Sequence, residues 1–181
     1  RKRRTRRLHR DAGIGRSGKA EGMSATTKAI VAELFERGDV YYNLQGSTPE
    51  EVIGSLAKLA KLPKGVDRAA FKAALLAREK LGSTAIGNGF AIPHPRQRLL
   101  AEEGAGFVAI GYLDEPVAWD APDGAPVTTV FLLLSSSADE HLTALSGLAC
   151  LANDTAFRAL VENQPVKQAI IDFLKSRKSC A

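Results

Sequence analysis

One segment, residues 81–96, constrains this 181-residue chain more than any other. It reads LGSTAIGNGFAIPHPR, in which glycines give way to a short apolar run that stops at a histidine between two prolines. A residue before proline is kept out of the helical region and each proline fixes its own φ, so Ile92 and His94 are expected to be extended. The sequence therefore predicts a stiff backbone that presents the imidazole of His94 at the end of a strand.

Helical and strand patterns surround this segment. Residues 104–113 and 127–134 are apolar on both faces, which is typical of strands that are covered on both sides. Amphipathic helical patterns precede, separate and follow these strands, and Thr48–Glu51 is a capping box with proline at the first helical position. The sequence predicts an α/β domain with a sheet between layers of helices. The other expected elements are helices over 23–37, 67–80, 139–151, 154–162 and 165–175, and a strand over 40–44.

The positive charge is concentrated at the N-terminal end of the chain. Residues 1–22 contain nine Lys or Arg and two acidic residues, whereas the rest of the chain contains 16 basic and 18 acidic residues. This segment lacks apolar periodicity and is predicted to be a disordered tail or linker ahead of one domain, residues 23–181. The excess of basic residues is therefore confined to the tail. We expect no nucleic-acid function for the domain, and only a weak contact of the tail with a nucleic-acid phosphate backbone at low salt.

Two phosphate-binding patterns occur within the basic segment. Gly13–Gly18 fits G-x-G-x-x-G, and Gly13–Lys19 fits G-x-x-x-x-G-K, but Ala20 stands where the second motif requires Ser or Thr. Both motifs need a preceding apolar strand, and Arg3–Arg10 is dominated by arginine. We interpret the segment as a basic linker.

Several classes of protein are excluded by composition. No run of 18 apolar residues occurs, and the N-terminal arginines are not followed by the apolar region of a secretory signal. Cys150 lies in an apolar helical pattern and Cys180 near the C-terminal end, so we expect no disulfide and a reducing, cytoplasmic location. Three histidines without paired cysteines or an H-E-x-x-H pattern predict no metal site.

The chemistry open to His94 is phosphoryl transfer, because a neutral imidazole is a competent nucleophile near neutral pH. Arg78, in the last turn of a predicted helix, can direct its guanidinium at phosphoryl oxygens. His141 falls in the first turn of another helix, where the helix dipole favours a neutral imidazole and an anion site. Gly87 and Gly89 allow backbone amides to approach a phosphoryl group closely.

Polar side chains near these residues leave alternatives open. The hydroxyls of Ser83 and Thr84 either cap a helix or bind phosphate. Glu79 is expected to be a surface charge or the partner of an arginine, and Trp119 to serve in packing. Leu142, after His141, is expected to face the core with Leu145 and Leu148.

Residues 77–94, AREKLGSTAIGNGFAIPH, resemble the active-site block of the phosphotransferase-system enzyme IIA (EIIA) domains of the fructose, mannitol and nitrogen-regulatory type. Glu140-His141-Leu142 resembles the second block of that family. The resemblance extends over about residues 40–174. It implies a mixed β-sheet sandwiched between helices.

The resemblance also implies roles for individual residues. The histidine of the I-P-H motif receives phosphate in that family, which implies His94 as the phosphorylated group, with Arg78 and His141 beside it. The donor would be the phosphocarrier HPr or its nitrogen-branch counterpart NPr. The result would be a phosphotransferase that uses a covalent phosphohistidine and no cofactor. Pro95 differs from many members, which carry a small residue there.

Three uses of such a phosphocarrier fit the sequence. We favour a nitrogen-regulatory protein whose phosphorylation state controls a target. The alternative is a sugar-specific EIIA that passes phosphate to a IIB protein. A third is a regulator with an upstream DNA-binding domain, because residues 37–43, RGDVYYN, resemble nitrogen-regulatory-type members that carry one.

Overall fold

Five strands form one mixed sheet in the order β1-β4-β5-β3-β2 in the computed structural model, which describes residues 23–176. The basic tail with its two glycine motifs, and Cys180, lie outside the described residues. β1 pairs with β4 in parallel, β4 with β5 antiparallel, β5 with β3 in parallel, and β3 with β2 antiparallel. The strands are β1 (Val40–Leu44), β2 (Ala85–Gly87), β3 (Phe90–Ala91), β4 (Phe107–Val117) and β5 (Val127–Leu134).

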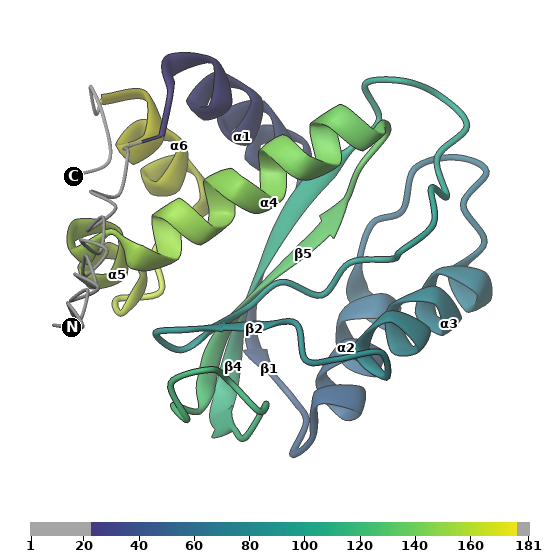
Figure 1. Cartoon of the computed structure of the whole chain (residues 1–181), viewed down its shortest axis with the longest axis horizontal. Helices are drawn as coiled ribbons and strands as arrows, with labels where there is room; N and C mark the ends of the chain where they lie inside the picture. The colour runs from purple at the N-terminus through teal and green to yellow at the C-terminus, as the bar shows by residue number, and fades with distance from the viewer. Residues whose placement is uncertain (1–22, 177–181) are drawn as a thin grey trace, which may run out of the picture.

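Six helices in the described residues cover both faces of the sheet. α1, α4, α5 and α6 lie on one side, and α2 and α3 lie on the other (Figure 1). The expected α/β sandwich with a mixed sheet is therefore confirmed. None of these helices is long and apolar enough to cross a bilayer. The helices are α1 (Ala25–Arg37), α2 (Pro49–Leu59), α3 (Arg68–Glu79), α4 (Ala138–Asn153), α5 (Thr155–Val161) and α6 (Lys167–Ser176).

The two long central strands supply side chains to both cores. In β4, Val108, Ile110 and Tyr112 pack towards the layer of four helices. Phe107 and Ala109, on the opposite face, pack towards α2 and α3. β4 is therefore apolar on both faces and covered on both sides, as the sequence predicted, since side chains on a strand point alternately to opposite sides.

Helix ends follow local capping chemistry. The Thr48 side chain accepts a hydrogen bond from the Glu51 amide at 3.3 Å, and the Glu51 carboxylate accepts one from the Ser47 amide at 2.8 Å. This arrangement satisfies amides that have no partner within the helix and fixes the start of α2 at Pro49.

The prediction of which α4 residues face the core was wrong for Leu142. Leu142 is 66% exposed, whereas Ala144, Leu148 and Leu151 are buried. At about 100° per residue, Leu142 lies roughly 200° around the helix from Ala144 and therefore faces away from the sheet. This places an exposed leucine directly after His141.

Candidate functional site

The parallel pairing of β3 and β5 brings two distant segments to the same edge of the sheet. Phe90 pairs with Thr129 and Ala91 with Val130, and the Leu133 amide donates to the Pro93 carbonyl at 3.0 Å. Parallel strands end at the same edge, so the residues that follow each strand meet there. His94 follows β3, and Ser135 and the first turn of α4 follow β5.

His94 is held in one tautomer by its own backbone. Its Nδ1 lies 2.7 Å from the Ile92 carbonyl oxygen. A carbonyl oxygen only accepts hydrogen bonds, so Nδ1 carries the proton and Nε2 has a free electron pair. The residue is only 7% exposed, which restricts the ring to this orientation. The nucleophilic atom of His94 is therefore Nε2.

Arg78 binds this nitrogen directly. The Arg78 Nε–H donates to Nε2 of His94 at 3.1 Å, and the Arg78 Nη1–H donates to the Gly82 carbonyl at 2.7 Å. Arg78 lies in the last turn of α3, as the sequence predicted. Its guanidinium is thus held beside the position that a group bonded to Nε2 would occupy.

His141 completes a cluster with His94. Their ring centroids are 5.1 Å apart with an interplanar angle of 62°. The Nδ1 atom of His141 lies 2.8 Å from the Ser135 hydroxyl, and Ser137 caps α4 by accepting from the Glu140 amide. When the Ser135 hydroxyl donates to Nδ1, the neutral ring carries its proton on Nε2 and can donate it to an anion. The structure therefore brings together the three residues expected to be catalytic.

Comparisons with known proteins agree with this geometry. The family described as "Phosphoenolpyruvate-dependent sugar phosphotransferase system, EIIA 2" matches residues 33–177 of the chain. The chain belongs to this EIIA family. A nitrogen regulatory protein of Pseudomonas aeruginosa is 35% identical over 142 residues, covering 76% of this chain and 90% of the relative. The nitrogen regulatory protein of Escherichia coli is 39% identical over 131 residues, covering 67% and 76% respectively.

Sugar-specific relatives and solved structures are also similar to this EIIA domain. The fructose-specific EIIABC component of Bacillus subtilis is 31% identical over 147 residues, which cover 80% of this chain and 23% of that protein. The crystal structure of the nitrogen regulatory protein IIA-Ntr of Neisseria meningitidis has a TM-score of 0.64 and 31% identity, covering 75% of this chain and 91% of that chain. The crystal structure of IIA mannitol of Escherichia coli has a TM-score of 0.56 at 20% identity, covers 75% of this chain and 95% of that chain, and shows the shared fold.

Burial favours the neutral form of both site histidines of this EIIA domain. Burial is the largest cause that lowers the pKa of His94 from 6.5 to about 4, and the positive charge of Arg78 lowers it further against the raising effect of the Ile92 carbonyl. Burial and Arg78 also lower the pKa of His141. His94 therefore keeps the electron pair on Nε2 throughout the neutral and mildly acidic range.

This shift predicts a pH dependence of stability. Between about pH 6.5 and 4 the unfolded chain binds a proton at His94 and the folded chain does not, so the free energy of unfolding falls as the pH falls. The contribution of His94 is roughly 1.4 kcal/mol per pH unit, or about 2 kcal/mol between pH 6.5 and 5.0. Urea unfolding at several pH values should show a shallower slope for His94→Gln than for the wild type. Equal slopes would contradict the neutral, buried imidazole.

The structure does not bring Gly87 and Gly89 to His94. With Asn88 they form the β2–β3 turn, where all three residues have positive φ (90°, 53° and 81° in chain order). The Asn88 Nδ2 donates to the Asn153 side chain at the C-terminal end of α4. That end is about 18 Å along the helix from His141, at 1.5 Å per residue. Both glycines therefore serve the turn through their positive φ, and we correct their expected proximity to the phosphoryl group.

Ser83 and Thr84 use their hydroxyls within the loop after α3. The Ser83 hydroxyl donates to the Trp119 carbonyl. The Thr84 hydroxyl and amide donate to the Glu79 carboxylate at 2.5 and 2.9 Å. Neither hydroxyl caps a helix, and direct phosphate binding by either stays a prediction that requires these bonds to break.

Glu79 is a residue that the sequence reasoning missed. It was expected to be a surface charge or the partner of an arginine, but its carboxylate accepts from Thr84 and, at 2.9 Å, from the Trp119 indole nitrogen. These bonds fix the loop whose Gly82 carbonyl holds Arg78. The available signal was Trp119, because a buried indole N–H needs an acceptor.

Replacing Glu79 by glutamine is expected to weaken both the fold and the site. The amide oxygen can accept from the Thr84 amide and the Trp119 indole, but the amide nitrogen cannot accept from the Thr84 hydroxyl. Bonds to a charged carboxylate thereby become bonds to a neutral amide, which costs about 1–2 kcal/mol of unfolding free energy. Urea unfolding measures this loss, and the phosphoryl-transfer rate should fall with it as Arg78 loses its fixed position. Glu103→Gln, at an exposed loop position, is the matched control. An E79Q variant as stable as E103Q would refute the role of this network.

Proposed function

We propose that this chain is a phosphocarrier of the nitrogen-regulatory EIIA type that accepts a phosphoryl group on Nε2 of His94. The observation that carries the proposal is the fixed tautomer of His94, with Nδ1–H donated to Ile92 and Nε2 turned to Arg78. Because Nε2 is unprotonated, it needs no separate general base, and its electron pair becomes available to the incoming phosphorus when Arg78 releases it.

The reaction moves one phosphoryl group between two imidazoles. The donor would be the phosphohistidine of HPr or NPr. Nε2 of His94 attacks phosphorus in line, the bond from phosphorus to the donor nitrogen breaks, and the donor imidazole leaves with the electron pair of that bond. Atoms and electrons balance with no cofactor, and the protein supplies positioning and charge stabilisation.

Arg78 and His141 would stabilise the phosphoryl oxygens. Arg78 gives up its bond to Nε2 when that atom attacks, and its Nε–H then lies beside the transferred group. A neutral His141 with its proton on Nε2 donates a second hydrogen bond. Charge-assisted bonds of this kind are the stronger ones, and they strengthen where negative charge develops.

Two exposed leucines beside the site support protein partners as the donor and the acceptor of the phosphoryl group. Leu81 and Leu142 are each 66% exposed. They lie next in sequence to Gly82, which holds Arg78, and to His141. Apolar side chains that flank a reactive group offer contact area to a protein surface, since the buried centre of an interface is depleted in charge.

The nitrogen-regulatory and sugar-specific alternatives differ in the molecule that receives the phosphoryl group from His94. Several nitrogen regulatory proteins are 35–39% identical to this chain, whereas two sugar-specific EIIABC components are 29–31% identical. We therefore favour transfer to, or phosphorylation-dependent binding of, a regulatory target over transfer to a IIB protein. A cytoplasmic location fits a pathway that starts from phosphoenolpyruvate, an intracellular metabolite.

A reconstituted relay tests this function. The protein is incubated with phosphoenolpyruvate, enzyme I and HPr, or with the nitrogen-branch enzyme I and NPr, and its intact mass is recorded over time. We expect an acid-labile gain of one phosphoryl group, faster with the nitrogen-branch pair. A faster gain with HPr would favour the sugar-specific alternative, and no gain with either pair would refute the phosphocarrier function.

A further inference from the structure

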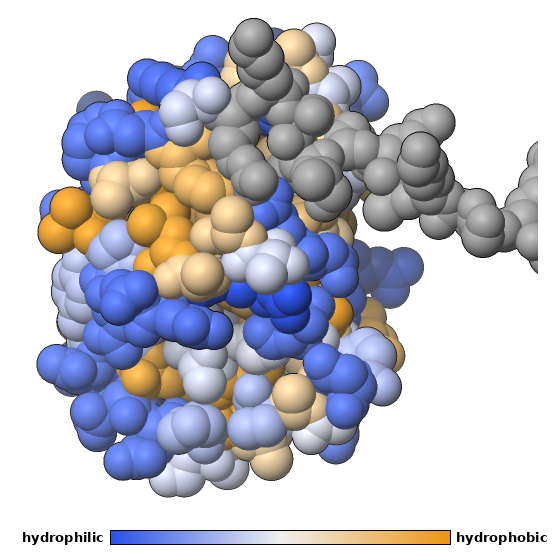
Figure 2. Space-filling model, turned by 90° about the vertical axis from the view of Figure 1, so that its left-hand side faces the viewer, coloured by the Kyte–Doolittle hydropathy of each residue, from blue (hydrophilic) through white to orange (hydrophobic). Residues whose placement is uncertain are grey.

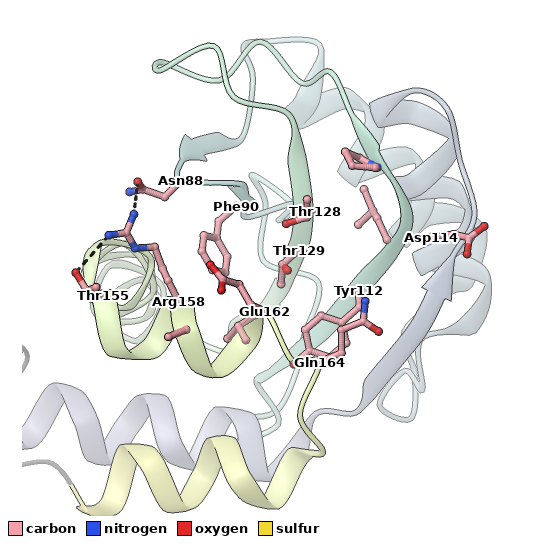
Figure 3. Close-up of a pocket in the computed structure, with 14 residues that line it drawn as sticks. Asn88, Phe90, Tyr112, Asp114, Thr128, Thr129, Thr155, Arg158, Glu162 and Gln164 are labelled. Atoms are coloured by element: carbon pink, nitrogen blue, oxygen red, sulfur yellow. Dashed lines mark hydrogen bonds between the residues drawn. The ribbon is translucent and has the colours of Figure 1, made fainter.

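A second cleft lies away from His94, between α5 and the strands β4 and β5 (Figure 3). Its volume is about 620 Å³, within the range of small-molecule sites. Figure 2 views the molecule from the α5 side and shows hydrophobic residues gathered in the upper part of this face, with mostly hydrophilic residues around and below them. The lining includes Asn88, Tyr112, Thr129, Arg158, Glu162 and Gln164.

Arg158 brings a positive charge to this cleft that neutral groups hold in place. Its Nη1–H donates to the Asn88 side-chain oxygen at 2.8 Å and its Nη2–H to the Thr155 hydroxyl at 3.3 Å. The Nε atom is buried without a hydrogen-bond partner. Within residues 23–176, no carboxylate lies within salt-bridge distance of this guanidinium. Its charge is thus positioned but not neutralised by a partner.

Glu162 brings a negative charge to the same wall. It follows Arg158 by four residues, the spacing at which helix side chains are neighbours. Its side chain projects into the region of Phe90 (Figure 3). The two charges form no ion pair within residues 23–176, and the guanidinium donates to Asn88 and Thr155 instead. The cleft therefore carries an unpaired cation and an anion on the same wall.

The opposite wall and floor suit a short, uncharged side chain. Phe90 and Tyr112 are buried aromatic residues at the floor. Thr128 and Thr129 of β5 line the facing wall and carry hydroxyl groups. A second carboxylate, Asp114, also lines the cleft. The Asp114 side chain points away from Arg158 and Glu162 (Figure 3), so a simple anion would meet the Glu162 carboxylate here and a simple cation would meet Arg158.

We propose that this cleft binds a small zwitterion of the α-amino acid class. The ligand carboxylate would accept from the unused Nη hydrogens of Arg158, and its ammonium group would donate to Glu162. Its side chain would lie over Phe90 towards the threonines of β5. The residues of the G-N-G turn, which the phosphoryl-transfer site does not use, thereby hold the charged anchor of a second site. This proposal does not depend on phosphoryl transfer at His94.

Amide chemical-shift titration of the whole protein tests the proposal. L-alanine, L-glutamine and L-leucine are the probes, with succinate as the anion control and ethanolamine as the cation control. We expect saturable shifts for at least one amino acid, confined to the cleft residues in β4, β5 and α5, and weaker or no shifts with either control. Equal shifts with succinate or with ethanolamine would overturn the zwitterion assignment.

Variants assign the binding to the two charges. Arg158→Gln and Glu162→Gln should each raise the Kd about tenfold or more, since hydrogen bonds to charged groups are the stronger ones. Lys64→Gln and Glu102→Gln, at exposed positions outside the cleft, are matched controls that should leave the Kd unchanged. Glu162 is exposed, so its variant tests the site even where Arg158→Gln unfolds. No saturable shift with any amino acid, or unchanged binding in E162Q, would overturn the proposal.

Discussion

Replacing His94 by alanine is expected to abolish phosphoryl acceptance completely. Within residues 23–176, the variant removes the imidazole whose Nε2 accepts from Arg78. His141 cannot replace it when the Ser135 hydroxyl donates to its Nδ1, because its Nε2 then carries the ring proton and has no electron pair for attack. In the reconstituted relay, the intact mass of His94→Ala should not change under conditions in which the wild type gains one phosphoryl group.

A matched variant separates loss of the nucleophile from damage to the loop. Gln97 is exposed in the same segment, and Gln97→Ala should accept phosphate like the wild type. Thermal melting should show that both variants are folded. Retained phosphorylation in His94→Ala would mean that another residue is the acceptor, which would contradict the site as described.

Replacing Arg78 by lysine is expected to slow phosphoryl acceptance by roughly 10²-fold. Removal of one preorganised donor to developing charge typically costs about 10²–10³-fold in rate. Lysine retains the charge but lacks the planar fork that bonds His94 and Gly82 at the same time. Rapid-quench measurement of phosphoryl transfer from phospho-NPr determines this rate.

The exposed neighbour Lys80 provides the control for charge. Lys80→Gln removes a positive charge from the C-terminal end of α3 and should change the rate only slightly, because only the backbone amide of Lys80 bonds to Arg78 and the substitution keeps that amide. A rate for Arg78→Lys equal to that of the wild type would show that charge alone suffices. That outcome would contradict a role for the fixed guanidinium geometry.

The sequence predicted the central site because its signals are local. Proline on each side of His94 fixes the backbone, and the glycine and serines that flank α3 and α4 locate Arg78 and His141 at helix ends. The meeting of these segments depends on the parallel register of β3 and β5, which two residues of β3 establish. A strand of that length gives no periodic pattern, so the register itself could not be read from the sequence.

Errors arose where tertiary contacts decide the role of a residue. Gly87 and Gly89 were expected near phosphate because they lie close to His94 in sequence, yet the extended chain carries them to the far end of α4. Glu79 was interpreted as a surface charge because the proximity of Trp119 is not visible from a separation of 40 residues. Leu142 was expected in the core because leucine is usually buried, although the helical phase of its neighbours places it outside.

The nitrogen that becomes phosphorylated tests the central claim most directly. Protein labelled with ¹⁵N in its histidines is phosphorylated through the relay, and long-range proton–nitrogen NMR spectra identify the modified ring atom. The hydrogen bond from Nδ1 of His94 to Ile92 predicts phosphorylation at Nε2, with Nδ1 still protonated. A phosphoryl group on Nδ1 of His94, or on His141, would contradict the mechanism.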